Sequence, residues 1–383
     1  MLAPEPFFQP RGTPISVYFR LKALSAMGHQ VDLITYPLGE DRIFPGLKIF
    51  RIPRLPGLLR IKIGPSFAKI PLDMMMAGWC LGKLIKKRYD VIFSHEEASF
   101  FGALFAKWGR IPHIYDMHSS LPQQLDNFDF TRSRAVKTIF RVLEKFVLKN
   151  SSSVIVICLD LYQQVKQMGF SEKSILLENF CEFDSPLLTQ NRRMKLRKRF
   201  AADNQKLVLY AGNFQSYQGI DLFLRAAAQI PDQRVVFLLV GGSPENVREK
   251  KRFTEELGLS ERVHFTGQVP PSQVSHYIDI ADVLVSPRTA GTNTPLKIYS
   301  FLKSGKPVVA TDLRTHTQVL DENIALLEEP EPDKMASAIK SACFDPEAEQ
   351  RAERAASMAL KKYSFSRYQE ILDKVLRKAV KIR

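Results

Sequence analysis

Cysteines are few in this sequence, and long apolar runs are missing. The 383 residues include only Cys80, Cys158, Cys181 and Cys343, and no two of them form a CxxC pair. This scatter excludes a disulfide framework and a zinc knuckle and favours a reducing compartment. No run approaches the ~18 apolar residues of a membrane span, and residues 1–4 lack the basic and apolar regions of a signal peptide. We therefore expect a cytoplasmic protein that is soluble or peripheral at the inner face of the membrane.

Acidic residues are too few to balance the basic ones. The sequence has 55 Lys and Arg against 40 Asp and Glu, a formal net charge of +15. Such an excess indicates polyanionic partners, namely nucleic acid, anionic lipid or phosphate-bearing substrates. No zinc-finger spacing, aromatic RNP pattern or basic leucine zipper accompanies the charge, so we do not expect nucleic-acid binding.

Two segments bear on contact with a membrane surface. Residues 132–149 alternate apolar and basic residues at helical spacing. This pattern predicts a basic amphipathic helix that packs on a sheet and is compatible with contact to an anionic membrane. Residues 70–85 form the longest apolar stretch, interrupted by Asp73 and Lys83. For this stretch we favour a helix packed on a sheet over one that lies at an interface.

Short β-branched runs alternate with helical patterns along the chain, which is typical of parallel sheets covered by helices. We therefore predict an α/β fold with two sheets of Rossmann type. The predicted strands are 30–36, 91–95, 113–117, 153–158 and 174–178 in the first half, and 206–211, 234–241, 262–266, 282–286, 307–311 and 325–328 in the second.

A polar segment containing Pro186 separates the two halves. We predict an N-terminal domain over residues 1–185, a second domain over 186–345, and C-terminal helices over 346–383 that cross back to the first domain. Ligands of such sheets bind at the carboxyl ends of the strands, so we expect the two domains to face each other across a cleft that holds the site.

The most informative segment is residues 286–311, which follow a strand, loop, helix, glycine and strand pattern. Pro295 suits the first helical position and Gly305 the C-terminal stop. The loop formed by Thr292, Asn293 and Thr294 is therefore expected to present backbone N–H groups at a positive helix terminus that can hold a phosphate. An ordinary strand-to-helix connection is the alternative.

Here the chain resembles the family 4 glycosyltransferases. KIYSFLKSGKPVVA at 297–310 is similar to their block in which a helix ends at glycine before Pro-Val-Val. YAGNFQSYQGID at 210–221, VGGSP at 240–244 and the Glu178-Asn179 pair resemble further family blocks, as does the beginning, with LAPEPF at 2–7 and RGTP at 11–14. The resemblance implies a GT-B fold and retaining transfer of a sugar from a nucleoside diphosphate to a hydroxyl of a glycan, glycolipid or lipid-linked acceptor.

Two departures from the family pattern affect the donor site. Thr292 and Ser300 stand where the family commonly has two glutamates, and the Gly212 turn lacks the usual arginine and lysine. We expect Arg288 and Lys297 to replace these charges. The predicted donor-binding residues are Gly212, Asn213, Gln218, Arg288, Thr292, Asn293, Thr294, Lys297 and Ser300.

In the first domain, His118 follows a predicted strand at its carboxyl end, where such sheets place active residues. The resemblance implies that it lies near the sugar and the acceptor, so we predict that it is catalytic; a structural histidine is the alternative. His95 and Glu96, which end the preceding strand, are predicted acceptor contacts, although acidic residues there also suit a helix N-terminus. The predicted N-terminal loop residues are Glu5, Gly12 and Thr13.

Neither a metal nor a resident cofactor is expected, and the nucleotide sugar serves as a co-substrate. Asp126 and Asp129 lack the Asp-x-Asp spacing of metal-dependent glycosyltransferases, and GT-B members generally use helix termini and basic side chains instead. Two other function classes stay open: a non-catalytic, degenerate GT-B binding module, and a nucleotide-sugar epimerase or hydrolase on the same fold.

The first strand of the sequence is short. A Rossmann-like domain opens with an apolar strand of about 5–6 residues, whereas only Met1, Leu2 and Ala3 precede Pro4. We expect a chain extended upstream by about 4–8 apolar residues to melt at a higher temperature, because a central strand is buried on both faces.

Overall fold

The computed structural model describes residues 1–9, 12–56, 61, 66, 69–122, 133–180 and 188–381. These form two compact units, each built on one parallel sheet. The first unit combines Met1–Asn179 with Phe365–Arg383, and the second is Phe180–Ser364. The division falls six residues before the boundary predicted between 185 and 186.

The first unit contains a seven-stranded parallel sheet in the order β3-β2-β1-β4-β5-β6-β7. The strands are β1 (Leu2–Ala3), β2 (Val31–Thr35), β3 (Leu47–Arg51), β4 (Ile92–His95), β5 (His113–Met117), β6 (Ser153–Val156) and β7 (Ser174–Leu176). All the strands predicted for this half are present. The edge strand β3 was not predicted, because Lys48 and Arg51 interrupt its apolar pattern.

Helices cover both faces of this sheet. They are α1 (Gly12–Ala26), α2 (Lys69–Lys86), α3 (Ala98–Gly109), α5 (Arg134–Asn150), α6 (Leu159–Gln167) and α15 (Phe365–Lys381), with a 3-10 turn at Ser171–Lys173. Successive residues of a strand point to opposite faces. Ile34 of β2 packs in the cluster that holds residues of α2 and α3, whereas its neighbour Leu33 packs with residues of α1. Thus α1 and the α2–α3 pair lie on opposite faces.

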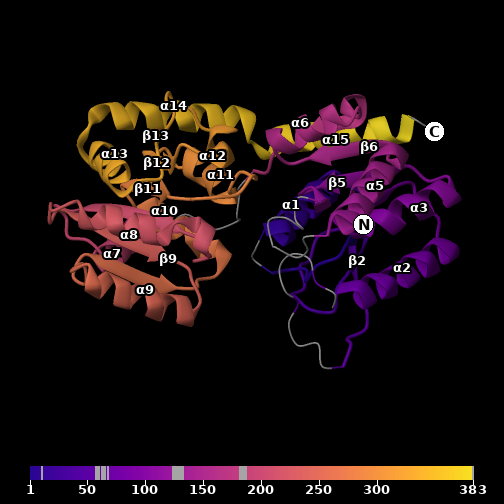
Figure 1. Ribbon diagram of the computed structural model, residues 1–383, viewed down its shortest axis with the longest axis horizontal. Helices are drawn as coiled ribbons and strands as arrows, with labels where there is room; N and C mark the ends of the chain where they lie inside the picture. The colour runs from indigo at the N-terminus through magenta and orange to yellow at the C-terminus, as the bar shows by residue number, and fades with distance from the viewer. Residues whose placement is uncertain are drawn as a thin grey trace. The chain divides into compact units, whose positions relative to one another are not determined.

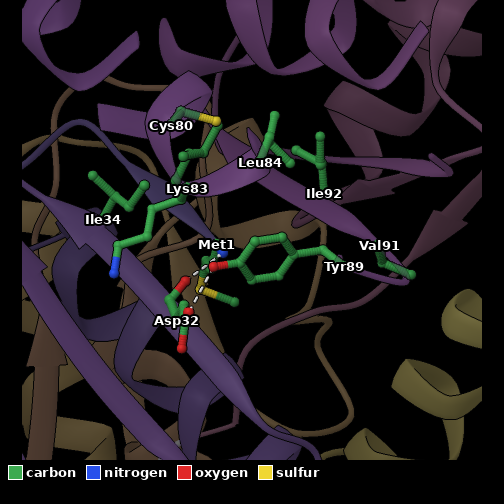
Figure 2. A pocket seen from close by; sticks show the side chains of 10 residues that line it. Met1, Asp32, Ile34, Cys80, Lys83, Leu84, Tyr89, Val91 and Ile92 are labelled. Atoms are coloured by element: carbon green, nitrogen blue, oxygen red, sulfur yellow. Dashed lines mark hydrogen bonds between the residues drawn. The ribbon is translucent and has the colours of Figure 1, made fainter. Parts of the chain in front are cut away.

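The amino-terminal edge of the sheet holds a small pocket beside β1 (Figure 2). There the Met1 ammonium donates to the backbone oxygen of Asp32 at 2.8 Å, and the Tyr89 hydroxyl donates to the Asp32 carboxylate at 2.6 Å. Burial lowers the pKa of the Met1 ammonium to about 6. Because ligands of parallel sheets bind at the carboxyl ends of the strands, this pocket lies at the wrong edge for an active site.

The second unit contains a six-stranded parallel sheet in the order β10-β9-β8-β11-β12-β13. Its strands are β8 (Lys206–Ala211), β9 (Val235–Val240), β10 (Val263–Gly267), β11 (Val283–Ser286), β12 (Val308–Thr311) and β13 (Leu326–Glu328). They agree with the six predicted strands to within one residue at each end. Two apolar clusters, one containing Val208 and Phe237 and the other Leu207 and Leu238, form the two halves of its core.

The helices of the second unit are α7 (Gln190–Arg197), α8 (Ile220–Ala228), α9 (Pro244–Glu256), α10 (Pro271–Ile280), α11 (Leu296–Lys303), α12 (Arg314–Thr317), α13 (Pro332–Phe344) and α14 (Pro346–Lys362), with a 3-10 turn at Ser216–Gln218. The loop before α11 ends one residue later than predicted, because Pro295 is the N-cap with an extended backbone rather than the first helical residue. Gly305 follows the helix with a φ of +67°, which suits its predicted role as the stop.

The two C-terminal helices belong to different units. α14 packs against α11 and α13 of the second unit, whereas α15 packs against α1, β5 and β6 of the first. Figure 1 draws both helices in yellow tones. Of the C-terminal helices over residues 346–383, α15 therefore belongs to the first unit, whereas α14 belongs to the second. Within the described residues, no helix is both long and apolar enough to cross a bilayer.

Candidate active site

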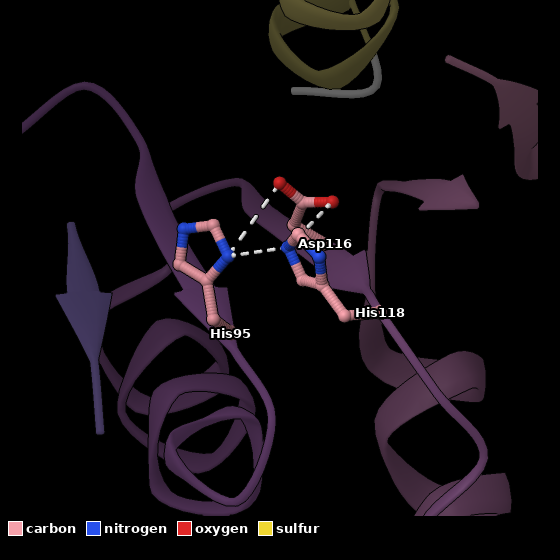
Figure 3. A group of neighbouring side chains, drawn as sticks. All are labelled: His95, Asp116 and His118. Carbon is pink, nitrogen blue, oxygen red and sulfur yellow. Dashed lines mark hydrogen bonds and ion pairs between the residues drawn. The ribbon is translucent and has the colours of Figure 1, made fainter. Parts of the chain in front are cut away.

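Three polar side chains meet at the carboxyl ends of β4 and β5 (Figure 3). His95 Nδ1 lies 3.1 Å from His118 Nε2, so one of these nitrogens donates to the other. Asp116 places a carboxylate oxygen 3.5 Å from His95 Nδ1 and the other 3.4 Å from His118 Nε2. All three residues are buried, and burial lowers the pKa of His95 to about 3, which keeps its ring neutral.

Arg20 of α1 completes the cluster. Its Nε and one terminal nitrogen donate to the two Asp116 oxygens at 2.8 and 3.2 Å, and its other terminal nitrogen contacts the hydroxyl of Tyr368 on α15. Burial alone would raise the pKa of Asp116, but the Arg20 charge and the bond from His118 outweigh it and hold that pKa far below its usual range. Asp116 is therefore ionised, with Oδ1 beside His118 Nε2 and Oδ2 beside His95 Nδ1.

The geometry of this cluster also matches a metal site in one respect. One ligand atom from each of His95, Asp116 and His118 lies within 4.8 Å of the others. However, the Arg20 guanidinium already binds both oxygens of Asp116, and a divalent cation there would have to displace or repel it. Without a metal, the same groups can donate, accept and relay hydrogen bonds.

Glu96 follows His95 in a left-handed backbone conformation, with a φ of 45°. Its carboxylate accepts a hydrogen bond from the Ser119 hydroxyl at 3.1 Å, beside His118. Burial and the neighbouring charge of Glu97 raise the pKa of Glu96 to about 7. This carboxyl can therefore hold or release a proton near neutral pH at the same edge as the histidines.

The predicted N-terminal loop residues lie near this edge or at the start of α1. Glu5 follows β1 and is buried, and its backbone oxygen accepts a hydrogen bond from the Thr35 hydroxyl at 2.6 Å. Gly12 and Thr13 begin α1, and a Cβ at Gly12 would meet no atom within 4 Å. Arg11, named with them in the family block, lies outside the described residues.

In the second unit, Lys297 reaches back from α11 to the turn after β8. Its Nζ lies 3.8 Å from the centroid of the Tyr210 ring, and a Cβ at Gly212 would lie only 3.3 Å from that nitrogen. Gly212 has a φ of 152°, so a side chain there would be strained as well as crowded. Lys297 Nζ is buried and, among the described residues, has no hydrogen-bond partner. Burial, with the nearby Arg288 charge, lowers the pKa of Lys297 well below its usual range.

Arg288 holds the loop that leads into α11. Its terminal nitrogen donates to the backbone oxygen of Asn293 at 2.7 Å and to the Thr315 hydroxyl at 2.9 Å. Gln318 donates to the backbone oxygen of Thr292 at 2.6 Å. The loop carbonyls are thus bonded to the protein, and the Thr294 hydroxyl is buried without a partner among the described residues. Three buried groups here lack a hydrogen-bond partner among the described residues and can donate to an anion: Lys297 Nζ, the Thr294 hydroxyl and Arg288 Nε.

The remaining predicted donor residues have different surroundings. The Tyr210 hydroxyl donates to the backbone oxygen of Asn213 at 2.6 Å and lies 3.4 Å from the side-chain oxygen of buried Gln218. Gln218 therefore supports the Gly212 turn from inside. Ser300 is half-buried on α11, one turn beyond Lys297.

Several residues around these sites carry no local sequence signal. Arg20 and Tyr368 are 348 positions apart and bond only because α1 and α15 pack together. His316 joins Ser286, at 2.9 Å, to the Thr311 hydroxyl, at 3.1 Å, and burial lowers its pKa to about 4. It anchors the strand ends from which the Arg288 loop departs. Only an alignment of related sequences or the fold itself could have singled out these residues.

Two Rossmann-like units with polar sites at the carboxyl ends of their strands define the class of GT-B proteins. Glycosyl transferases group 1 matches residues 191–358, and the glycosyl transferase 4-like domain matches residues 18–177. The chain belongs to the family 4 glycosyltransferases, and sugar transfer is the activity of that class.

Known proteins of this class resemble the chain over most of its length. Alpha-D-kanosaminyltransferase of Streptomyces kanamyceticus is 23% identical over 70% of this chain and 71% of its own. Alpha-monoglucosyldiacylglycerol synthase of Streptococcus pneumoniae is 24% identical over 79% of this chain and 68% of its own. The crystal structure of Anabaena HepE in complex with UDP superposes with a TM-score of 0.77 and 19% identity, covering 98% of both chains.

Proposed function

We propose that this glycosyltransferase moves a hexosyl group, with retention, from a nucleoside diphosphate sugar to a hydroxyl of a glycan, glycolipid or lipid-linked acceptor. The second unit would bind the donor, and the first would bind the acceptor. The observation that carries the proposal is the buried side-chain nitrogen of Lys297, which has no hydrogen-bond partner among the described residues and lies beside the Gly212 turn.

An unpaired buried cation is costly, and a bound anion would offset that cost. The hardest step of the transfer is departure of the diphosphate from an oxocarbenium-like centre, which needs positive potential at the leaving phosphate. Lys297, Arg288 and the Thr294 hydroxyl would supply this potential and the hydrogen bonds. Because no carboxylate forms an ion pair with either cation within the described residues, their charge remains available to a ligand.

The first unit would orient the reacting groups. His118 is held by Asp116 and His95, so its ring has a fixed edge for a sugar or acceptor hydroxyl. Glu96, with a pKa of about 7, would receive the proton that the acceptor hydroxyl loses. His95 would position His118 rather than contact the sugar.

Two of the related proteins support the proposed donor and acceptor. The Anabaena protein has been solved with UDP and with UDP-glucose, and the Streptococcus pneumoniae enzyme is named for a glucosylated diacylglycerol. A nucleotide-sugar donor and a lipid acceptor extend to this chain as proposals. They accord with its net charge of +15, and we propose that the enzyme works at the cytoplasmic face of a membrane.

The donor site is tested by calorimetric titration of UDP and GDP into the Lys297→Ala variant. Loss of a charge-assisted hydrogen bond should weaken binding of the preferred nucleotide by about 1.5–3 kcal/mol. Lys303→Ala changes an exposed lysine of the same helix and should leave the affinity unchanged. Equal affinity of the Lys297 variant and the wild type would remove Lys297 from the donor site.

The missing glutamates at Thr292 and Ser300 favour one competing function, a binding module without activity. Donor turnover with and without an acceptor separates the possibilities. A transferase releases the nucleoside diphosphate faster when a suitable acceptor is present. A hydrolase releases it at the same rate without one, an epimerase converts the sugar without release, and a binding module does neither.

A further inference from the structure

Helix α2 is apolar on two sides. Leu72, Met76 and Cys80 are buried against the sheet. A second set of apolar side chains, spaced by four, seven and four residues, forms a stripe along the whole solvent-facing side of the helix. The members of this α2 stripe are Ile70, Met74, Leu81 and Ile85, and all are exposed. The favoured prediction for residues 70–85, packing on a sheet, therefore accounts for only half of the apolar side chains.

The neighbouring helices add to this surface. α2 packs against α3 and α3 against α5, so the three helices lie side by side. Trp108 at the end of α3 is exposed, as are Ile139 and Val142 of α5. Within the described residues, eight of the fourteen large exposed apolar side chains lie on these three helices. This is a concentration rather than the usual scatter of single exposed side chains, and such concentrations mark interaction surfaces.

The charged side chains of the same three helices are mainly basic. They carry nine basic side chains and two acidic ones. Both acidic groups are bonded inward: Asp73 accepts from the Tyr36 hydroxyl at 2.7 Å, and Glu144 accepts from the backbone N–H of Leu121 at 3.0 Å. Lys86 and Lys145 are exposed beside the apolar side chains. An apolar stripe bordered by basic groups is complementary to a surface of anionic phosphates above hydrocarbon.

We propose that the α2 stripe docks the first unit on an anionic lipid membrane, with its apolar side chains below the headgroups and the lysines of α2 and α5 at the lipid phosphates. This inference rests on the proposed function, because an enzyme with a lipid-linked acceptor must reach its acceptor at a membrane. The α2 stripe is the surface that we propose binds this membrane.

The first turn of α2 connects this surface with the candidate active site. Lys69 Nζ lies 3.4 Å from a carboxylate oxygen of Glu97, two residues beyond His95. Ile70, the first member of the stripe, is the next residue along the helix. A lipid whose chains stay in the bilayer would therefore bring its headgroup to the edge that carries His95 and Glu96.

Vesicle co-sedimentation of the full chain tests the proposal. The wild type should bind vesicles of equal parts phosphatidylcholine and phosphatidylglycerol far better than vesicles of phosphatidylcholine alone, and salt should weaken the binding. The double variant Met74→Glu with Ile85→Glu should lose about ten-fold or more in partitioning, since it places two anionic groups in the stripe. These side chains are 72% and 77% exposed, so the fold should tolerate the change.

A matched control uses the same substitution on another basic helix. Met194 of α7 is 51% exposed among arginines and lysines, and Met194→Glu should bind vesicles like the wild type. A second double variant, Lys86→Gln with Lys145→Gln, should reduce the dependence of binding on salt. Equal loss in the Met194 variant, or none in the stripe variant, would overturn the proposal.

Two further measurements separate other outcomes. UDP titration on the same variants reports on the donor site alone, so intact UDP binding without vesicle binding contradicts the docking surface and leaves the proposed transfer standing. Light scattering reports the oligomeric state. If the stripe variant converts a dimer to a monomer and the wild type ignores vesicles, the stripe is an interface with a second copy and the proposal is wrong.

Discussion

Each unit buries a group of charged side chains at the carboxyl edge of its sheet, but only one group is balanced. In the first unit, the Asp116 carboxylate is bonded to Arg20 and lies beside two histidines. In the second, Lys297 and Arg288 lie near each other, and neither forms an ion pair within the described residues. The balanced group has its charges paired within the unit, and we propose that it positions His118. We propose that the unbalanced group binds an anion.

Breaking the balanced group should give the largest effect. Asp116→Asn leaves the Arg20 guanidinium buried without its counter-charge, which should lower the free energy of unfolding of the first unit by about 3–5 kcal/mol. Thermal unfolding followed by circular dichroism measures the change.

A double variant makes the test possible even if Asp116→Asn alone does not fold. Adding Arg20→Met to Asp116→Asn removes the orphaned charge and should recover much of the lost stability. An Asp116→Asn protein that melts like the wild type would show that the pair does not hold the unit together.

Removing the buried charge of Lys297 should stabilise the free protein, in contrast to the loss of the Asp116 charge. Without nucleotide, Lys297→Met should raise the melting temperature, because it replaces a buried amino group that has no hydrogen-bond partner among the described residues with an apolar side chain of similar length that can still pack on the Tyr210 ring. With UDP present, the variant should gain less thermal stabilisation than the wild type, in line with a binding loss of about 1.5–3 kcal/mol. Lys303→Met is the control. A destabilised variant in the absence of nucleotide would show that Lys297 has a structural partner.

Glu96 adds a pH-dependent test of the first unit. Its pKa is raised from 4.5 in the unfolded chain to about 7, so its contribution favours folding below pH ~4.5 and is lost as the pH rises through 7. Glu96→Gln mimics the protonated acid and should be more stable than the wild type at pH 8, by about 1–2 kcal/mol, with little difference at pH 5. Melting curves at both pH values measure this.

The exposed residue Glu353 provides the matched control for Glu96, since Glu353→Gln should change neither curve. Asp73, whose pKa burial also raises to about 7, titrates in the same range but is present in both proteins, so it cancels in the comparison. A constant difference between pH 5 and pH 8 would contradict the raised pKa of Glu96.

The sequence predicted the fold better than it predicted the sites. β5 and β8 begin and end at the predicted residues, and β8 is an apolar run after Lys206. β3 was missed, since an edge strand with Lys48 and Arg51 resembles a loop. Where a segment has a regular hydrophobic pattern, the residues that the pattern predicts to be buried are buried in the structure, so the pattern is enough to predict the strand.

The two sites differ in how far the sequence could predict them. Lys297 could be proposed because it lies in a recognisable block and next to a loop that ends at Pro295. The residues that hold Asp116 could not, because Arg20 lies 96 positions from Asp116 and Tyr368, which contacts Arg20, lies near the far end of the chain. Their meeting depends on the packing of α1 and α15 against one sheet, which no local pattern records.

The smallest expected effect comes from Thr294, whose buried hydroxyl lacks a partner among the described residues. Thr294→Val keeps the shape of the side chain and should change the stability of the free protein by less than about 0.5 kcal/mol. It should weaken UDP binding by about 0.5–1.5 kcal/mol if the hydroxyl donates to the diphosphate.

Thr311→Val is the matched control for Thr294, because it makes the same change where the hydroxyl is bonded. The Thr311 hydroxyl donates to the backbone oxygen of Arg288 at 2.5 Å and lies 3.1 Å from His316 Nδ1. Its loss should destabilise the free protein by about 1–3 kcal/mol, since it leaves buried polar groups unpaired. Melting curves and UDP titrations on the two variants therefore distinguish a hydroxyl that stabilises the fold, as expected for Thr311, from one that binds a ligand, as proposed for Thr294. Equal destabilisation by both variants would place Thr294 among the structural groups and leave Lys297 and Arg288 as the only side chains proposed to hold the donor phosphates.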